Sequence, residues 1–323
     1  MKLWLKALIS VALIAVLCWQ IDLAELQSTF AQADLRLWLL AFVLFLGQQV
    51  LVAYCWQMLL EAEKQHVPFI KTLEVHFVGS FFGTFLPSSV GMDILRVYQL
   101  GRYLRRGVDA ASTMFVARVV GFLINFVLAL AVALPVSRTL GDARLFWAVL
   151  AGTLAFAAML VVMLHGFSLR ILRHVLQRFK LDGLAEKIAE FRNGIFEIFK
   201  KRGAAGALIV LSFSYQALGI VIIYLIGVAL QIELTLWYYF IYIPLITTIT
   251  VLPISVAGIG VRENAFVFFF ALAGVVASQS LSLSLMVFAQ TLGLALLGGI
   301  WYFFARDDRQ ALEASKELQK QSA

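Results

Sequence analysis

Blocks of about 20 apolar residues recur along the chain, and no other feature limits its fold as strongly. A helix needs a run of about that length to cross ~30 Å of hydrocarbon, where it satisfies its own backbone hydrogen bonds. The blocks lack the alternation that a membrane β-strand shows. Only 14% of the 323 residues are charged, against about 25% in an ordinary soluble domain. The sequence therefore predicts an all-α, polytopic integral membrane helix bundle that forms a single domain over residues 1–323.

Six stretches are long and apolar enough to be full spans: 3–21, 36–60, 112–134, 144–165, 204–230 and 281–304. Two further regions, 72–95 and 237–277, are interrupted by proline, glycine and charged residues. We expect each of them to form a re-entrant or broken-helix hairpin. The breaks are predicted at Pro87 and Gly91 in the first hairpin and at Pro253, Gly258 and Gly260 in the second.

Basic residues flank the spans unequally, which predicts the orientation of the chain. Lys2 and Lys6 precede the first span, whereas the loop 22–36 that follows it is mostly acidic. The segment 168–202 carries nine Lys and Arg against four Asp and Glu, and its apolar residues recur at helical spacing. We therefore expect both termini, the amphipathic basic segment 168–202 and the tail 305–323 on the cytoplasmic side.

With this orientation the first hairpin starts and ends on the cytoplasmic side, and the second starts and ends outside. The stretches LPSSVGMDILR (86–96) and LPISVAGIGVR (252–262) share a Pro-x-Ser-Val start and an arginine nine residues after the proline. Hairpins that enter from opposite faces with similar sequences indicate an inverted-topology repeat.

Five ionic residues at the breaks or inside a span are the candidate site, because a charge at membrane depth costs at least about 2.5 kcal/mol. They are Asp93, Arg96, Arg118, Arg262 and Glu263. Broken helices and charges persist in hydrocarbon when they are buried in protein or line a wet cavity, so a polar groove between the hairpins is predicted. Guanidinium groups match phosphate oxygens, which makes the arginines candidate phosphate ligands. The hydroxyls Ser89 and Ser255, beside the two prolines, complete the predicted substrate-binding set.

Each ionic residue also has a plainer explanation. Arg118 lies inside a span with no acidic neighbour in sequence, so its partner is Asp93, a lipid phosphate, or the headgroup layer reached by snorkelling. For Arg262 and Glu263 the plainer explanation is a mutual or cross-repeat salt bridge that holds the second hairpin shut. Such a bridge is compatible with ligand contact, because an arginine has five donors and one carboxylate does not use them all.

No pattern of catalysis or metal binding accompanies these residues. The sequence contains no Walker A loop and no nucleophile elbow, and its histidines lack metal-ligand spacing to Cys or carboxylates. We expect no enzymatic activity, no cofactor, no metal site and no nucleic-acid partner.

Four stretches together resemble the lysylphosphatidylglycerol synthase transmembrane, or flippase-like, family: GSFFGTFLPSSVGMDILRVYQLGR (79–102), ARVVGFL (117–123), LPISVAGIGVRENAFVFFFALAGV (252–275) and GLALLGGIWYFF (293–304). In two-domain relatives this module translocates an aminoacylated phospholipid that a fused soluble synthase makes. Because the sequence ends just after the last span, we expect a standalone membrane module without aminoacyl transfer. Asp93, Arg96, Arg262 and Glu263 match the family pattern directly.

Two departures from that pattern concern the first hairpin and the span after it. Met92 stands where the family usually has a second glycine, and Ala117 stands where it has an acidic residue. Loss of the acid removes a near partner of Arg118, which favours an Arg118 that faces a headgroup.

The resemblance implies a lipid translocase of a bacterial cytoplasmic (inner) membrane, which moves an anionic phospholipid or a polyisoprenyl-phosphate-linked lipid. Its partners are then membrane lipid headgroups. The alternative is a non-catalytic membrane subunit that anchors or assists a glycosyltransferase or another lipid-modifying enzyme through the segment 168–202.

Overall fold

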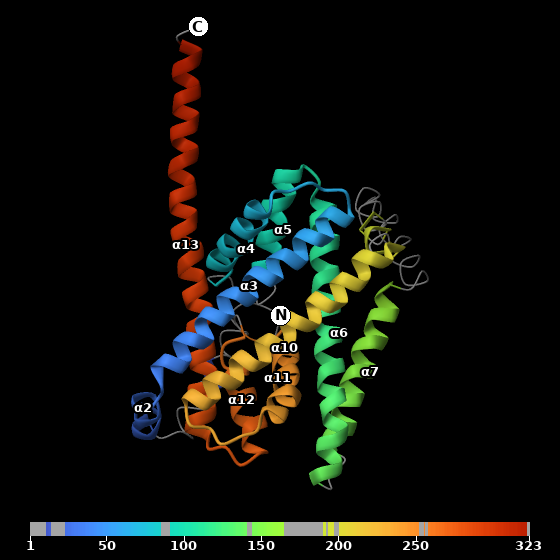
Figure 1. Ribbon diagram of the computed structural model, residues 1–323, viewed down its shortest axis with the longest axis vertical. Coiled ribbons are helices and arrows are strands. Elements are labelled where there is room, and N and C mark those ends of the chain that lie inside the picture. Colours follow the sequence, from blue (N-terminus) through green and yellow to red (C-terminus); the bar gives the residue numbers. More distant parts are fainter. Residues whose placement is uncertain are drawn as a thin grey trace.

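A computed structural model describes residues 11–13, 23–84, 91–140, 144–164, 190–191, 193–196, 200–251, 255 and 258–321. Its long elements are all helices (Figure 1). They are α2 (Leu23–Ala31), α3 (Leu35–Ala62), α4 (Phe69–Thr84), α5 (Gly91–Leu104), α6 (Gly107–Leu140), α7 (Arg144–Leu164), α10 (Arg202–Ala229), α11 (Leu236–Val251), α12 (Val261–Ala271) and α13 (Ala277–Gln321). The prediction of an all-α polytopic bundle is confirmed.

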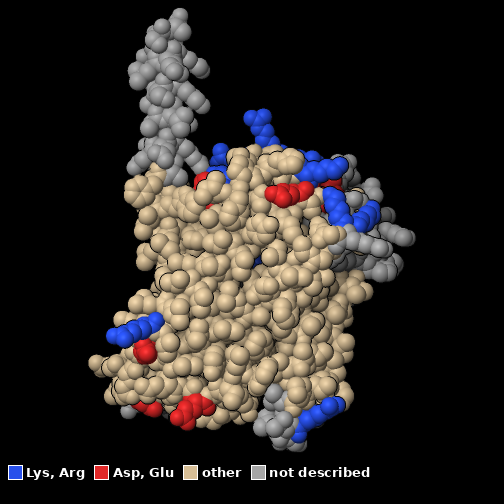
Figure 2. All heavy atoms as spheres, viewed as in Figure 1, with Lys and Arg blue, Asp and Glu red and all other residues tan. Residues whose placement is uncertain are grey.

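The outer surface of the bundle is apolar over a broad band. Figure 2 shows Lys, Arg, Asp and Glu gathered toward the two ends of the molecule, with few between them. Large apolar side chains such as Val43, Val210 and Phe303 point outward from the long helices. Among the described residues, four helices are long and apolar enough to cross a membrane: α3, α6 as far as Pro135, α10, and α13 as far as Phe304. An exposed apolar belt of this extent belongs in lipid, so the chain is a multi-pass membrane protein.

The predicted spans coincide with helices wherever the structure describes them. Their ends follow local chemistry: the Asp34 carboxylate accepts hydrogen bonds from the backbone N–H groups of Arg36 (2.8 Å) and Leu37 (3.3 Å) and so caps α3. Most of the predicted first span, 3–21, and most of the basic segment 168–202 lie outside the described residues, and residues 11–13 of that span are helical. Within that segment, Phe191 and Ile195 pack against buried residues of α3, α6 and α10. The tail as far as Gln321 continues α13 as helix.

Both predicted hairpins are present as pairs of short helices, α4 with α5 and α11 with α12. Gly91 is buried and begins α5. In the second hairpin, Gly258 and Gly260 have φ angles of +79° and +83°, values that a residue with a Cβ rarely adopts, and Gly260 is the N-cap of α12. Pro87, Ser89 and Pro253 lie outside the described residues.

The packing of the helices has the symmetry of an inverted repeat. α4 and α12 both pack on α13, whereas α5 and α11 both pack on α6, and α3 packs on α10. Exchanging α3 with α10, α4 with α11, α5 with α12 and α6 with α13 maps these pairs onto one another. Figure 1 shows α4 and α5 toward the upper end of the bundle and α11 and α12 toward the lower end. The two hairpins therefore approach the middle of the molecule from opposite sides, as inverted repeats do.

Candidate functional site

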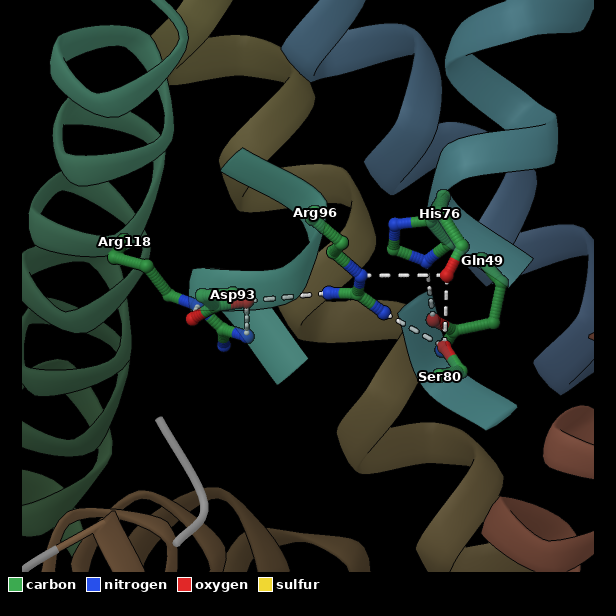
Figure 3. Close-up of polar contacts among 6 residues, drawn as sticks. All are labelled: Gln49, His76, Ser80, Asp93, Arg96 and Arg118. Atoms are coloured by element: carbon green, nitrogen blue, oxygen red, sulfur yellow. Dashed lines mark hydrogen bonds and ion pairs between the residues drawn. The ribbon is translucent and has the colours of Figure 1, made fainter. Parts of the chain in front are cut away.

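The first hairpin and α6 bring three ionic side chains together (Figure 3). Arg118 of α6 donates two hydrogen bonds to the Asp93 carboxylate, from Nε to Oδ2 (2.6 Å) and from Nη2 to Oδ1 (2.7 Å). Arg96 Nη1 donates a third, at 3.3 Å, to Asp93 Oδ1. Asp93 lies in the first turn of α5, where the helix dipole favours a carboxylate. Two guanidinium groups thus share one carboxylate, and the cluster carries a net charge of +1.

Arg96 is held in place by α4. Its side chain is buried, Nη2 donates to Ser80 Oγ (2.7 Å), and Nε donates to the His76 carbonyl (3.3 Å). His76 Nε2 lies 3.0 Å from Gln49 Oε1 of α3. A Cβ on Gly79 would collide with Arg96 Cγ, so the absence of a side chain at this position leaves room for the Arg96 side chain to pack against α4.

Arg118 differs from Arg96 in having an accessible side chain and an N–H group without an acceptor. About half of its side chain (49%) is accessible, and this residue lines a cavity. No described residue accepts a hydrogen bond from Nη1. A guanidinium that is oriented by one carboxylate and still has unused N–H groups can bind a second oxyanion.

The cavity has a volume of about 430 Å³ and is lined by side chains of α3, α4, α5, α6, α10, α11 and α13. Arg96 and Arg118 line one part of it, and Thr247 of the second hairpin lines another. A smaller cavity of about 150 Å³ adjoins it and shares six lining residues with it: Phe45, Gln48, Asn125, Gln216, Thr247 and Thr291. The larger volume lies within the range usual for ligand sites, about 300–1,000 Å³.

Several lining residues were missed by the sequence analysis, chiefly the amides Gln48, Asn125 and Gln216. Their signal was present, because each is a polar residue inside an otherwise apolar span. Such residues usually face the interior of a bundle or a wet cavity.

The second hairpin forms a different kind of site. Arg262 Nη2 donates to Glu263 Oε1, and Arg262 Nε donates to Ser284 Oγ of α13 (3.2 Å). The Arg262 guanidinium lies 4.5 Å from the centre of the Phe288 ring, a cation–π distance. The other carboxylate oxygen of Glu263 accepts a hydrogen bond from Gly260 N–H (2.7 Å), which caps α12.

The structure does not bring this second set of residues to the cavity. Arg262, Glu263 and Ser255 line neither the larger nor the smaller cavity. Ser255 is buried, and its hydroxyl has no hydrogen-bond partner among the described residues. The mutual pair of Arg262 and Glu263 is one of the plainer alternatives that the sequence left open. The described part of the chain also contains no group of three or more His, Cys, Asp or Glu side chains that could hold a metal ion.

Comparison with protein families places the whole bundle in one of them. The model of the lysylphosphatidylglycerol synthase TM region matches residues 3–299, which include both hairpins, three of the four long apolar helices and most of the fourth. Comparisons with curated proteins and with solved structures found no match. Because the match extends over nearly the whole chain, the protein belongs to the family of lysylphosphatidylglycerol synthase transmembrane regions.

Proposed function

We propose that the protein is a lipid translocase that binds the phosphate of an anionic phospholipid or polyisoprenyl-phosphate lipid at Arg118 and Arg96. The observation that carries this proposal is the net charge of +1 on the cavity wall, with Arg118 oriented by Asp93 and still able to donate. A phosphate diester has a single negative charge and two free oxygens, which suits the remaining donors of a guanidinium. The acyl or prenyl chains would stay in the bilayer.

The packing symmetry supplies a route between the two leaflets. In transporters built from inverted repeats, the site lies at the repeat interface near the middle of the bilayer, and the repeats move against each other. Here the larger cavity is lined by α4 and α5 of the first hairpin and by Thr247 of the second. Opening past one hairpin or past the other would expose the headgroup to one side of the membrane at a time.

Vectorial movement of a lipid requires no bond to be made or broken, and we propose no enzymatic activity. The membrane in question would be a bacterial inner membrane. Lys64, Arg102, Arg105 and Arg106 follow α3 or lie at the junction of α5 and α6, on the end of the bundle that the positive-inside rule assigns to the cytoplasm.

Reconstitution of the purified full-length chain tests this function. Proteoliposomes would carry phosphatidylglycerol labelled on its acyl chain, and the readout is the rate at which label in the inner leaflet becomes accessible to a membrane-impermeant quencher. Arg118→Gln and Arg96→Gln should slow transfer by about 10- to 100-fold, the equivalent of about 1.5–3 kcal/mol for a hydrogen bond to a charged group.

Arg36→Gln is the matched control, because Arg36 is an exposed guanidinium at the start of α3 that does not line the cavity. It should transfer lipid at the wild-type rate. Equal rates for wild type, Arg118→Gln and the Arg96→Gln/Arg118→Gln double variant would contradict the proposal. No transfer by wild-type protein, together with co-purification of a soluble enzyme, would favour the alternative of an anchoring subunit.

A further inference from the structure

Away from the arginines, the walls of the two adjoining cavities are uncharged, and they combine apolar side chains with amides and hydroxyls. Their hydrogen-bonding side chains are amides and hydroxyls: Gln48, Asn125, Gln216, Thr247, Gln290 and Thr291. Asn125 lies two helical turns beyond Arg118 on α6, a distance of about 10 Å along the helix axis. A ligand whose phosphate sits at Arg118 would therefore extend the rest of its headgroup among these neutral groups.

These neutral side chains have hydrogen-bonding capacity that the protein does not use. Gln290 is buried, and its Nε2 has no partner among the described residues. Asn125 is 5% exposed and makes no side-chain hydrogen bond within the described part of the chain. Leaving a buried polar group unpaired costs about 1–3 kcal/mol, so a bound group that pairs with these amides would recover part of that free energy. Hydroxyl groups suit them because a hydroxyl both donates and accepts.

Two of the amides present acceptors in particular. Gln48 Nε2 donates to the Tyr215 carbonyl (2.8 Å), and Gln216 Nε2 donates to the Gly121 carbonyl (2.8 Å). Each bond uses the amide nitrogen and leaves the side-chain oxygen able to accept a hydrogen bond from a ligand.

The walls carry no negative charge that would balance a cation. Among the described residues that line the two cavities none is Asp or Glu, and the nearby Asp93 is already bound by both arginines. An ammonium group that entered would lose its water without gaining a carboxylate, in the field of a cluster of charge +1.

We infer that the site takes a lipid whose phosphate carries an uncharged, hydroxyl-rich group such as glycerol or a sugar, and that it discriminates against the same headgroup once it carries an aminoacyl ammonium. The inference rests on the proposed function and assigns the part of the headgroup beyond the phosphate to the amide-lined end of the cavities.

Three acyl-chain-labelled lipids in phosphatidylcholine proteoliposomes test the selectivity. Phosphatidic acid presents the phosphate alone, and phosphatidylglycerol adds two hydroxyls. Lysylphosphatidylglycerol has one of these hydroxyls esterified with lysine, which adds two amino groups. Wild-type protein should transfer phosphatidylglycerol about fivefold faster than phosphatidic acid and about tenfold faster than the lysyl ester, ratios that correspond to one or two hydrogen bonds.

Variants of the amides that line the cavities test separately the preference for hydroxyl groups and the discrimination against an ammonium. Asn125→Leu and Gln290→Met remove the amides and approximately keep the side-chain shapes, and they should lower the ratio of phosphatidylglycerol to phosphatidic acid transfer about fivefold. Asn125→Asp places a carboxylate in the cavity and should raise the ratio of lysyl ester to phosphatidylglycerol. Ser214→Ala is the control, because Ser214 bonds to the Val210 carbonyl of its own helix (2.9 Å) and does not line either cavity.

The outcomes are distinguishable. Equal transfer of the three lipids, or a preference for the lysyl ester, overturns this inference and leaves the translocase proposal standing, provided that Arg118→Gln slows them all. Transfer of none of the three, by wild type or by any variant, overturns the translocase proposal and this inference with it.

Discussion

Arg96 in the first hairpin and Arg262 in the second occupy matching places, and the residue 22 positions later decides what surrounds each of them. In the first hairpin that residue is Arg118, on α6; in the second it is Ser284, on α13. Both helices contact their hairpin in the same way under the symmetry of the packing. One framework therefore holds a guanidinium pair in one half and a guanidinium with a hydroxyl in the other.

The two ionic clusters therefore differ in net charge and in whether they line the cavity. Asp93 is shared by two arginines, which leaves a net positive charge facing the cavity, whereas Glu263 has Arg262 to itself and the pair is neutral. Ser284, Phe288 and Gly260 make further contacts with that pair. An inverted repeat thus need not contain two equivalent sites: under the proposed function, one half binds the ligand and the other holds its hairpin together.

The largest effect should come from breaking the neutral pair. Glu263→Ala leaves the part-buried Arg262 without a carboxylate and removes the cap of α12, so we expect the free energy of unfolding to fall by about 3 kcal/mol, the low end for breaking a buried pair. Thermal unfolding in detergent measures the loss. Glu25→Ala, at an exposed position of α2, is the control and should change little. If Arg262→Met/Glu263→Gln is as unstable as Glu263→Ala, the cost does not come from an unpaired buried charge.

Removal of the other carboxylate sharpens the comparison. Asp93→Asn raises the charge of the first cluster to +2, and we expect a smaller loss of stability, about 1–3 kcal/mol, because part of the cluster faces the cavity. An anion can replace the lost carboxylate there. Added phosphatidylglycerol should therefore restore the melting temperature of Asp93→Asn and leave that of Glu263→Ala unrestored. If phosphatidylglycerol restored both variants equally, the difference between a cluster that lines the cavity and an ion pair that does not would be contradicted.

A third variant tests how firmly α4 fixes Arg96. Gly79→Ala places a Cβ against Arg96 Cγ; because that side chain is long and can shift, we expect a loss of about 1 kcal/mol, at the low end for overpacking. Gly47→Ala on α3 meets no atom within 4 Å and should be neutral or stabilising by about 0.5–1 kcal/mol. Identical melting temperatures for Gly79→Ala and Gly47→Ala would show that the packing of Arg96 does not depend on a glycine at position 79.

The smallest effect is expected at the position that matches Arg118. Ser284→Ala removes one hydrogen bond to Arg262 (3.2 Å) and leaves Glu263 and the Phe288 ring in place, so the loss should be about 0.5 kcal/mol. Ser282→Ala, whose hydroxyl bonds to the Ser278 carbonyl of its own helix (2.8 Å), is the control. A loss above about 2 kcal/mol, specific to Ser284, would mean that this hydroxyl holds the second hairpin more strongly than one hydrogen bond permits.

The helices were predictable because runs of apolar residues and the length of a span leave few alternatives. The span predicted at 36–60 is α3, Leu35–Ala62, and the one predicted at 204–230 is α10, Arg202–Ala229. The span predicted at 112–134 is part of a longer helix, α6. It begins earlier, at Gly107, and the Thr113 hydroxyl bonds to the Asp109 carbonyl (2.8 Å) in that added part of the helix.

The partners of the arginines were only partly predictable. Asp93 could be named as a partner of Arg118, because it is the acidic residue beside the first break, but the alternative of a lipid phosphate could not be excluded from the sequence. That Arg262 stays outside the cavity was not predictable at all. Arg262 instead packs against Ser284 and Phe288 of α13, and similar stretches of sequence in the two hairpins do not specify such contacts.

The long helix α13 has a mechanical consequence. It is continuous over 45 residues, which at about 1.5 Å per residue is a rod of about 68 Å, and it packs against α4 at one level and α12 at another. A tilt of this rod would shift one helix of each hairpin in the same movement. A displacement of its protruding C-terminal end (Figure 1) would therefore move helices in both halves of the bundle.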